Sequence, residues 1–377
     1  MSRAVGRRVI ALVSDAFGGR GGIALYDRYF LRATCSHPDV KEVIALPRAI
    51  YYDLEALPPE MRYVTSAAGG IAQFTAQTVA LLGRVSSADL IVCGLIHLLP
   101  FARMLGARFG CPVLPLVYGY EAWHPSPHWS ANALCRSLKG FVAIRRLTAE
   151  RLMDWSRMRH RHYYYLPNCI DETEYGIAPR RADLVERFRL AGRKVVMTTG
   201  RMDTMGYDQR KGFDEMIEAL PLLAQQIPNV TYLIMGDGDD RPRLEQKAVD
   251  LGVRDRLTFT GYVPEGQKAD YFRLADVFAM PGSNPVFDTY PFRFVYLEAL
   301  ACGVPVVAAQ PDPSERDDPD AKALIVQVDP NDTEAIVRGV LSAMTVAERG
   351  INPVLPKFYY RAFERRTHAI ISAMINR

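Results

Sequence analysis

The sequence predicts an α/β protein made of two doubly wound domains, each with a parallel sheet covered by helices. Short apolar runs rich in β-branched residues alternate along the chain with longer segments of helical period, which is the pattern of a parallel sheet with crossover helices. The pattern starts afresh near residue 194, and 377 residues are long for a single domain. Two domains of one class are therefore expected.

Strands and helices alternate in both halves. In the first half we expect strands at residues 9–14, 42–46, 90–94, 113–117, 141–144 and 163–166, and helices at 23–34, 71–82 and 148–155. In the second half we expect strands at 194–199, 231–235, 257–260, 277–280 and 305–308, and helices at 214–223, 241–251, 267–274, 294–301 and 333–342. Ligands of such folds lie at the carboxyl ends of the strands, so functional residues are sought in the loops that follow them.

The domain boundary is predicted in a polar stretch, residues 171–192, which contains Pro179 and many charges. This divides the chain into an N-terminal domain at 1–170, a linker at 171–192 and a C-terminal domain at 193–356. Residues 357–377 have helical period again. We expect this last helix to pack back toward the N-terminal domain.

Composition narrows the class of protein. A formal charge of +4 is small for this length, so no nucleic-acid partner is expected. The six cysteines form no CxxC pair and no metal-type spacing with histidine, which is typical of reduced, buried thiols in a cytosolic protein. The apolar stretch near the N-terminus has only about five residues, and no stretch approaches the ~18 of a membrane-spanning helix. We expect a cytoplasmic protein.

A glycine-rich loop, Gly18 to Gly22, follows the first expected strand and opens the first helix. Glycines at such a junction let backbone N–H groups approach an anion, and the helix N-terminus adds a favourable dipole. A turn without any ligand explains this loop about equally well. The loop alone is thus a weak signal.

The second half carries a stronger set of residues. Gly200-Arg201 ends an expected strand, and Lys211 directly precedes the next helix. Arginine offers a planar fork and lysine a mobile point charge, which together suit a diphosphate. Glu298 lies on an apolar helix, where a carboxylate can accept hydrogen bonds from two ribose hydroxyls. Taken singly, each of these would more often be an ordinary surface or capping residue.

The order of these stretches is specific. GR…KGFDEMIEAL, MGDGDDRPRL, FTGYVP, ADVFAMPG and LEALACGVPVVA follow one another in the C-terminal half, and GGRGGIALYDRYF, YGYEAWHP, FVAIRRLTAERL and LPNCID give a looser match in the N-terminal half. Together they resemble the retaining glycosyltransferases of the GT-B fold, family 4, also called glycosyl transferases group 1. The resemblance covers nearly the whole chain and implies two Rossmann-like domains that face a cleft.

The resemblance implies roles for single residues. Arg201 and Lys211 would neutralise the donor diphosphate, with Gly200 beside them, and Glu298 would hold the ribose hydroxyls. The base would lie against the backbone of turns in the second domain, at Gly236, Tyr262 and Val263. The first domain would approach the diphosphate through its glycine loop, at Gly21 and Gly22.

No metal or other cofactor is expected, because the resemblance implies that the Arg201–Lys211 pair does the electrostatic work of a cation. The nucleotide diphosphate sugar would be a co-substrate. The string Asp237-Gly238-Asp239 matches a metal-binding DxD only by its letters. It falls in the family's glycine turn, so we interpret it as structural.

One departure from the family pattern concerns the transferred sugar. The family has a Glu eight residues before the position of Glu298, followed by Gly-Phe-Gly, whereas this chain has Tyr290, Pro291, Phe292 and Arg293. Asp288 is the candidate substitute for the missing carboxylate. Arg293 suggests an acidic donor such as a uronic acid. Tyr290 and Phe292 are retained as donor-side candidates.

A second departure concerns the first domain. The family often has His-Gly where this chain has Tyr118-Gly119, and Glu121 and Trp123 follow on the expected acceptor side. Tyrosine can donate a hydrogen bond but is a poor base at neutral pH. His97, after the strand expected at 90–94, is a second catalytic candidate. A lone histidine among apolar residues is more often a core group that is satisfied within the protein.

The resemblance implies transfer of a sugar with retention of anomeric configuration. The segment 145–161 is basic and partly apolar, with Leu147, Leu152, Met153 and Trp155 among its arginines. This favours contact with anionic lipid and a lipid-linked glycan acceptor in bacterial polysaccharide or glycolipid assembly, at the inner face of the membrane. A solvated helix face explains the same residues. The alternatives are a nucleotide-sugar epimerase or hydrolase of the same fold, and a non-catalytic nucleotide-sugar-binding protein.

Overall fold

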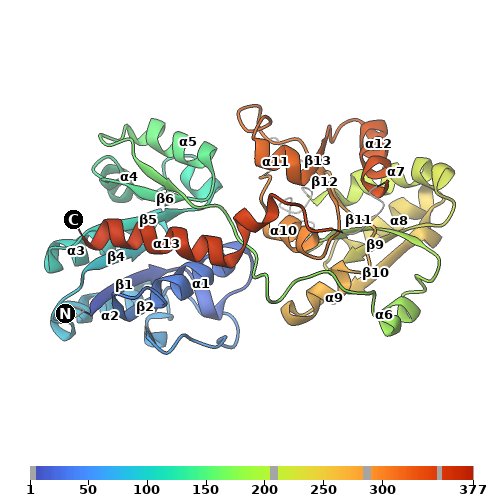
Figure 1. The fold of residues 1–377 in the computed structure, drawn as a ribbon. Helices are drawn as coiled ribbons and strands as arrows, with labels where there is room; N and C mark the ends of the chain where they lie inside the picture. The colour runs from blue at the N-terminus through green and yellow to red at the C-terminus, as the bar shows by residue number, and fades with distance from the viewer. Residues whose placement is uncertain (1–5, 204–210, 283–289, 346–349, 377) are drawn as a thin grey trace. The chain divides into compact units, whose positions relative to one another are not determined.

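The computed structural model describes residues 6–203, 211–282, 290–345 and 350–376. The chain divides into two compact units (Figure 1). Unit 1 is Met1–Cys169 together with Tyr360–Arg377, and unit 2 is Ile170–Tyr359. The prediction of two doubly wound α/β domains is confirmed, since each unit holds its own parallel sheet.

Unit 1 contains a seven-stranded sheet of order β3-β2-β1-β4-β5-β6-β7. All of its neighbouring strands pair in parallel. The strands are β1 (Arg7–Val13), β2 (Val40–Pro47), β3 (Met61–Tyr63), β4 (Leu90–Cys93), β5 (Val113–Val117), β6 (Phe141–Ala143) and β7 (Tyr163–Tyr165). The chain runs outward from β1 to β3 and then returns to β4, so the strand order reverses between β1 and β4. This is the switch point at which such sheets bind ligands.

The α-helices of unit 1 are α1 (Gly22–Cys35), α2 (Ile71–Arg84), α3 (Leu99–Phe109), α4 (Trp129–Cys135), α5 (Arg146–Ser156) and α13 (Tyr360–Ile375). The last of these lies alongside α1 (Figure 1). Phe363 packs edge-on against Tyr26 with ring centroids 5.4 Å apart, and Ser36 Oγ donates to Glu364 Oε1 at 2.6 Å. The C-terminal helix therefore returns to the first domain, as predicted.

Unit 2 contains a six-stranded parallel sheet of order β10-β9-β8-β11-β12-β13. Its strands are β8 (Lys194–Thr199), β9 (Val230–Met235), β10 (Leu257–Gly261), β11 (Val277–Met280), β12 (Val306–Ala309) and β13 (Ile325–Val328). Its helices are α6 (Ala182–Arg187), α7 (Phe213–Gln226), α8 (Arg241–Asp250), α9 (Lys268–Phe272), α10 (Phe294–Ala301), α11 (Pro319–Leu324) and α12 (Thr333–Met344). Two apolar clusters form the core of this unit.

The stretch 171–192, expected to be a linker, is grouped with unit 2. It folds partly into α6, and Tyr175, Leu184 and Leu190 are buried in one core cluster of that unit. Its high polarity concealed these three apolar residues, which are too widely spaced to form a periodic run. The stretch therefore adds to the core of unit 2.

The turns at the carboxyl edge of the unit 2 sheet pack backbone against backbone. A Cβ atom on Gly236 (φ +138°) would lie 2.0 Å from the carbonyl oxygen of Gly200, and one on Gly212 (φ +78°) would lie 2.5 Å from the nitrogen of Gly282. Both positions combine positive φ with a contact that leaves no room for a side chain. The loops that follow β8, β9 and β11 are thereby held together.

We expect Gly236→Ala to lower the free energy of unfolding of unit 2 by about 3 kcal/mol, because the backbone it would strike cannot move away cheaply. The measurement is the urea midpoint by far-UV circular dichroism. Gly261→Ala is the matched control: Gly261 also has positive φ (+73°) but faces open space, so its loss should be about 1 kcal/mol.

The three tryptophans, Trp123, Trp129 and Trp155, all lie in unit 1. Their fluorescence therefore reports on unit 1 in the same titration. Equal losses for Gly236→Ala and Gly261→Ala would contradict the steric explanation.

Candidate functional site

Arg201 and Lys211 lie at the same strand end in unit 2. A Cβ atom on Gly200 would lie 3.1 Å from Cδ and Cε of Lys211, so the lysine side chain crosses the backbone directly beside Arg201. The Arg201 side chain is 74% exposed, and its Nε lies 2.5 Å from Asp203 Oδ2. The structure thus brings together the two cations that the sequence predicted for a diphosphate.

Glu298 is a buried carboxylate with spare hydrogen-bonding capacity. It lies on α10 and is 2% exposed. Burial raises the pKa of Glu298, Lys268 and a hydrogen bond from Tyr175 act to lower it, and the net shift is upward. Its Oε2 accepts no hydrogen bond from any described residue. A buried acceptor without a partner costs free energy that a ligand hydroxyl would restore.

Lys268, on α9, is a member of this site that the sequence did not reveal. Burial acts to lower the pKa of Lys268, but Glu298 and Glu265 together raise it above its ordinary value. Its Nζ lies 2.8 Å from Glu265 Oε1. In the sequence it is one lysine of a short polar helix, and only the packing of α9 beside α10 brings it near Glu298.

The residues predicted to line the base follow β9 and β10. The N–H of Gly236 donates to the carbonyl of Gly261 at 3.1 Å, which ties the two strand ends together. Val263 is buried, whereas the Tyr262 side chain is 60% exposed. An exposed aromatic ring at this strand end offers a surface on which a base could stack.

The departures near α10 have different environments. Phe292 is 3% exposed and stacks on Phe358 with centroids 4.6 Å apart, and Tyr290 packs edge-on against it at 5.8 Å. Phe292 is therefore a core residue. Arg293 precedes α10, and its Nη1 lies 3.7 Å from Met280 Sδ at the end of β11. Asp288 lies outside the described residues.

The Asp237-Gly238-Asp239 string forms a tight turn after β9. Asp237 Oδ1 accepts the N–H of Gly238 at 3.0 Å, and a Cβ atom on Gly238 would lie 1.9 Å from the carbonyl oxygen of Met202. In the part of the chain that the structure describes, no group of three or more His, Cys, Asp or Glu is placed to hold a metal ion.

The glycine loop of unit 1 opens α1 at the switch point. Gly21 has φ +92°, and a side chain there would meet nothing within 4 Å. Arg28 is buried, and its Nη1 donates to the carbonyls of Gly19 at 2.9 Å and Ala16 at 3.2 Å. These two hydrogen bonds hold the backbone of the loop in place. The first N–H groups of α1, including that of Gly22, have no intrahelical acceptor and suit an anion.

Tyr118 follows β5, but its phenol points into the core of unit 1. It is 6% exposed, and its hydroxyl donates to Oδ1 of Asp27, which is fully buried on α1. Burial raises the pKa of Asp27 to about 8, despite the opposing hydrogen bond from Tyr118. Tyr118 is a catalytic and acceptor-side candidate from the sequence, and in the structure its hydroxyl belongs to a buried Asp–Tyr pair.

Glu121 and Trp123 shape the turn that follows Tyr118. The Glu121 carboxylate accepts the N–H of Tyr118 at 2.6 Å and that of Gly119 at 2.9 Å. The Trp123 ring is buried, its Nε1 donates to Thr148 Oγ1 at 3.0 Å, and the Arg151 guanidinium lies 4.0 Å from its centroid. Both residues hold the backbone of this turn in place.

His97 lies on the short helix η3 (Ile96–Leu98), after β4. Its Nε2 is 3.1 Å from Nη1 of Arg48, and its ring centroid is 6.2 Å from that of His128. Burial, followed by the positive charges of Arg48 and His128, lowers the pKa of His97. The histidine is therefore a neutral group in basic surroundings at pH 7.

The basic segment 145–161 differs from the expectation of a lipid-binding helix. Leu147, Leu152 and Met153 on α5 are buried, and Trp155 donates from Nε1 to the Ala122 carbonyl at 2.8 Å. The apolar face is thus used within unit 1, and the exposed side chains of the segment are basic or acidic, with Glu150 and Asp154 the acidic ones. None of the described helices is both long and apolar enough to cross one.

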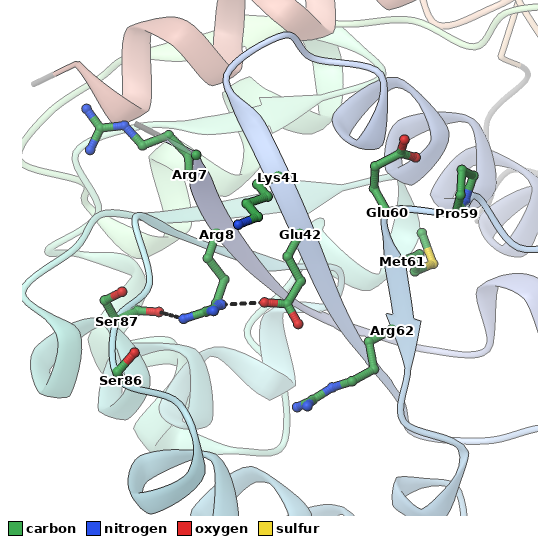
Figure 2. Close-up of a pocket in the computed structure, with 11 residues that line it drawn as sticks. Arg7, Arg8, Lys41, Glu42, Pro59, Glu60, Met61, Arg62, Ser86 and Ser87 are labelled. Atoms are coloured by element: carbon green, nitrogen blue, oxygen red, sulfur yellow. Dashed lines mark hydrogen bonds and ion pairs between the residues drawn. The ribbon is translucent and has the colours of Figure 1, made fainter. Parts of the chain in front are cut away.

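A pocket of about 460 Å³ lies at the opposite, amino edge of the unit 1 sheet (Figure 2). Arg8 crosses it, with Nε 2.6 Å from Glu42 Oε2 and Nη1 2.9 Å from the Ser87 carbonyl oxygen. Arg7 pairs with Asp89 at 2.8 Å. Much of the positive charge of the pocket is thus neutralised, and none of the candidate residues of unit 1 lines it.

The family model "Glycosyl transferases group 1" matches residues 193–345. A GDP-mannose-dependent alpha-(1-6)-phosphatidylinositol monomannoside mannosyltransferase of Mycolicibacterium smegmatis is 32% identical over 256 residues, which cover 64% of this chain and 62% of that protein. A lipopolysaccharide core biosynthesis glycosyltransferase, LpsE, of Rhizobium meliloti is 29% identical over 265 residues, which cover 63% of this chain and 70% of that protein. The chain thus matches less than two thirds of the length of the mycobacterial relative.

Two solved structures share the fold along nearly the whole chain. Sucrose-phosphate synthase from Thermosynechococcus elongatus has a TM-score of 0.76 at 18% identity and covers 98% of this chain and 99% of its own. HepE from Anabaena in complex with UDP has a TM-score of 0.73 at 17% identity and covers 97% of this chain and 100% of its own.

The Asp27–Tyr118 pair predicts a pH effect on stability. Because the pKa of Asp27 is raised to about 8 in the folded chain, the group stabilises the fold below the unfolded pKa near 4. That contribution is lost as pH rises toward 8. Asp27→Asn removes the titration of this carboxyl group, so the free energy of unfolding of the variant relative to the wild type should rise by about 4 kcal/mol between pH 5 and pH 8.

Urea titration followed by tryptophan fluorescence measures this difference in unit 1. Asp53→Asn, at an exposed loop position, is the control and should show the same difference at both pH values. A pH-independent difference for Asp27→Asn would mean that Asp27 is ionised in the folded chain.

Proposed function

We propose, since the chain belongs to the group 1 glycosyltransferases of the GT-B fold, that it moves a sugar from a nucleotide diphosphate sugar to an acceptor hydroxyl. The reaction retains the anomeric configuration and needs no metal ion. The acceptor is a glycolipid or lipid-linked glycan, and the protein works at the cytoplasmic face of a membrane. GDP-mannose is the first donor to test, because the mycobacterial relative is named for it.

The observation that carries the proposal is the unpartnered, buried Oε2 of Glu298. A carboxylate this buried is unfavourable unless it is compensated. Lys268 supplies part of the compensation as a nearby positive charge, and the two ribose hydroxyls of a nucleotide would supply the hydrogen bonds.

Arg201 and Lys211 at the end of β8 account for the leaving group. As the bond between the anomeric carbon and the phosphate oxygen breaks, negative charge grows on the diphosphate, and two cations held at one strand end stabilise it. The acceptor oxygen then bonds to the anomeric carbon on the same face. Its proton passes to the departing phosphate oxygen, so the step balances without a metal or a protein nucleophile.

The acceptor class rests on the relatives and on charge. The relatives' names describe work on phosphatidylinositol mannosides and on the lipopolysaccharide core. Arg157, Arg159 and Arg161 are exposed beyond α5 and could approach anionic headgroups. A non-catalytic nucleotide-sugar-binding protein is the second candidate, favoured by the buried Tyr118 hydroxyl and by Tyr290 at a carboxylate position.

We expect release of a nucleoside diphosphate from one of a panel of UDP-, GDP- and ADP-sugars, stimulated by a bacterial lipid extract. Mass spectrometry measures both products. Arg201→Ala should lower turnover about 100-fold or more, because it removes a charge that acts on the leaving group. Arg338→Ala, an exposed arginine on α12, is the matched control and should leave turnover unchanged. Donor binding without release on any donor or extract would favour the non-catalytic candidate.

The role of Glu298 is tested by comparing the wild type with Glu298→Gln, each with nucleotides that have or lack the ribose hydroxyls. Removing the ribose hydroxyls should weaken nucleotide binding to the wild type about 10- to 100-fold, the range for hydrogen bonds to a charged group. Glu298→Gln should bind the normal nucleotide more weakly and lose most of this discrimination. Calorimetry with GDP, UDP and their 2′,3′-dideoxy forms measures both the affinity and the discrimination. If Glu298→Gln discriminated as strongly as the wild type, the ribose would lie elsewhere.

A further inference from the structure

A cluster of basic side chains on unit 1 has no role in the reaction as described so far. Arg48 follows β2, His97 follows β4, and His128 precedes α4. The Arg48 guanidinium and the His97 imidazole are 3.1 Å apart, and the His128 ring is 6.2 Å from that of His97. Three loops from different parts of the sequence thus meet at one point.

We propose that Arg48, His97 and His128 bind a phosphate group, and that the acceptor of the proposed reaction carries this phosphate. The assignment of the phosphate to the acceptor rests on the proposed function. The site itself rests on the geometry and charge of the three side chains.

The first argument is the lack of a counter-charge. Within the described ranges no carboxylate pairs with Arg48, whose side-chain contact is the ring of His97. Other arginines of unit 1 are matched: Arg8 with Glu42 at 2.6 Å and Arg28 with Glu55 at 2.9 Å. An arginine that faces histidines and no acid produces a local positive potential suited to an anion.

The second argument comes from the hydrogen bond. Arginine can only donate, so Nε2 of His97 must be the acceptor, and the ring must be neutral with its proton on Nδ1. Protonation of Nε2 would break this bond and place two cations 3.1 Å apart. An anion that accepts from both groups would remove the repulsion, so binding an anion and taking up a proton are coupled.

The charged and titratable groups that act on His97 are Arg48, from the loop after β2, and His128, from the loop before α4. Both lower the pKa of His97, in addition to burial. A bound anion would offset the repulsion from Arg48 and His128 and so favour the protonated ring. Affinity for an anion should therefore rise as pH falls.

The third argument is position. The N–H of Arg48 donates to the carbonyls of Val13 at 3.0 Å and Ser14 at 2.8 Å, at the end of β1. This places Arg48 at the carboxyl edge of the sheet that also carries the Gly18 to Gly22 loop. Donors from three loops around one point suit a tetrahedral oxyanion better than a planar carboxylate. The cluster thus lies at the ligand-binding edge of the domain assigned to the acceptor.

Large apolar side chains are exposed close by in the sequence. Trp129 directly follows His128 and is 80% exposed, and Tyr51, three residues after Arg48, is 71% exposed. A phosphate that is linked to an apolar group would gain contacts there. The shared chemistry is a phosphate ester, and its source is either a lipid headgroup or a water-soluble sugar phosphate.

Sulfate is the probe for the site, because it stays a dianion between pH 6 and pH 8 and any pH dependence therefore comes from the protein. Calorimetry on the full chain should show binding that tightens about tenfold from pH 8 to pH 6. His97→Gln should reduce this pH dependence, and His97→Gln combined with His128→Gln should remove it. Arg48→Gln should weaken binding at least tenfold at both pH values. Arg62→Gln and His160→Gln, both at exposed positions, are the charge-matched controls and should bind sulfate like the wild type.

Two phosphate esters then separate the sources. Dihexanoyl phosphatidic acid, used below its micelle concentration, and glycerol 3-phosphate should each displace sulfate. Tighter binding of the lipid identifies a lipid acceptor, and equal binding identifies a soluble one. No sulfate binding to the wild type, or equal losses in Arg48→Gln and Arg62→Gln, would overturn the site.

Donor turnover, measured separately, distinguishes this result from the proposed function. Turnover of a nucleotide sugar without sulfate binding would refute the phosphate site and leave the transferase intact. Sulfate binding without turnover of any donor would retain the site and refute the transferase.

Discussion

The structure of the candidate donor site depends on the close approach of three backbone turns at one edge of the unit 2 sheet. Gly236 lies against the carbonyl of Gly200, and Gly212 lies against the backbone of Gly282. Because glycine has no Cβ atom, the ends of β8, β9 and β11 can approach to a distance that a side chain at either position would prevent. That approach places Lys211 across Gly200 and beside Arg201. The two positive charges therefore meet because the neighbouring turns contain glycines.

Each unit buries a carboxyl group, and the two groups have different surroundings. Asp27 of unit 1 is held by the Tyr118 hydroxyl, and burial raises its pKa to about 8, so the neutral acid is the stable form at neutral pH. Glu298 of unit 2 has Lys268 nearby and keeps one oxygen without a hydrogen-bond partner among the described residues. Asp27 Oδ2 likewise has no hydrogen-bond partner among the described residues. The two acids differ in their neighbours, since Asp27 accepts from a phenol and Glu298 has a lysine nearby.

The elements that the sequence predicted well are those with long apolar runs. The central strands β1, β4, β5, β8, β9 and β11 were expected within one or two residues, because strands buried on both faces are nearly continuous in valine, isoleucine and leucine. The three-residue strand β3 and the edge strand β13 were missed. β3 is too short to show a period, and β13 has only four residues, of which the middle two are half-buried, so neither stands out from its surroundings.

The sequence by itself determined the fold class and the returning C-terminal helix, and it singled out Arg201, Lys211 and Glu298 as candidates for the donor site, because each depends on local patterns in a fixed order along the chain. The tertiary structure decided which way side chains point and which distant loops meet. It turned Tyr118 toward Asp27, placed Phe292 in the core, buried the apolar face of α5, and brought Lys268 to Glu298 and Arg48 to His97. These outcomes depend on packing between elements far apart in sequence, and no local period records such contacts.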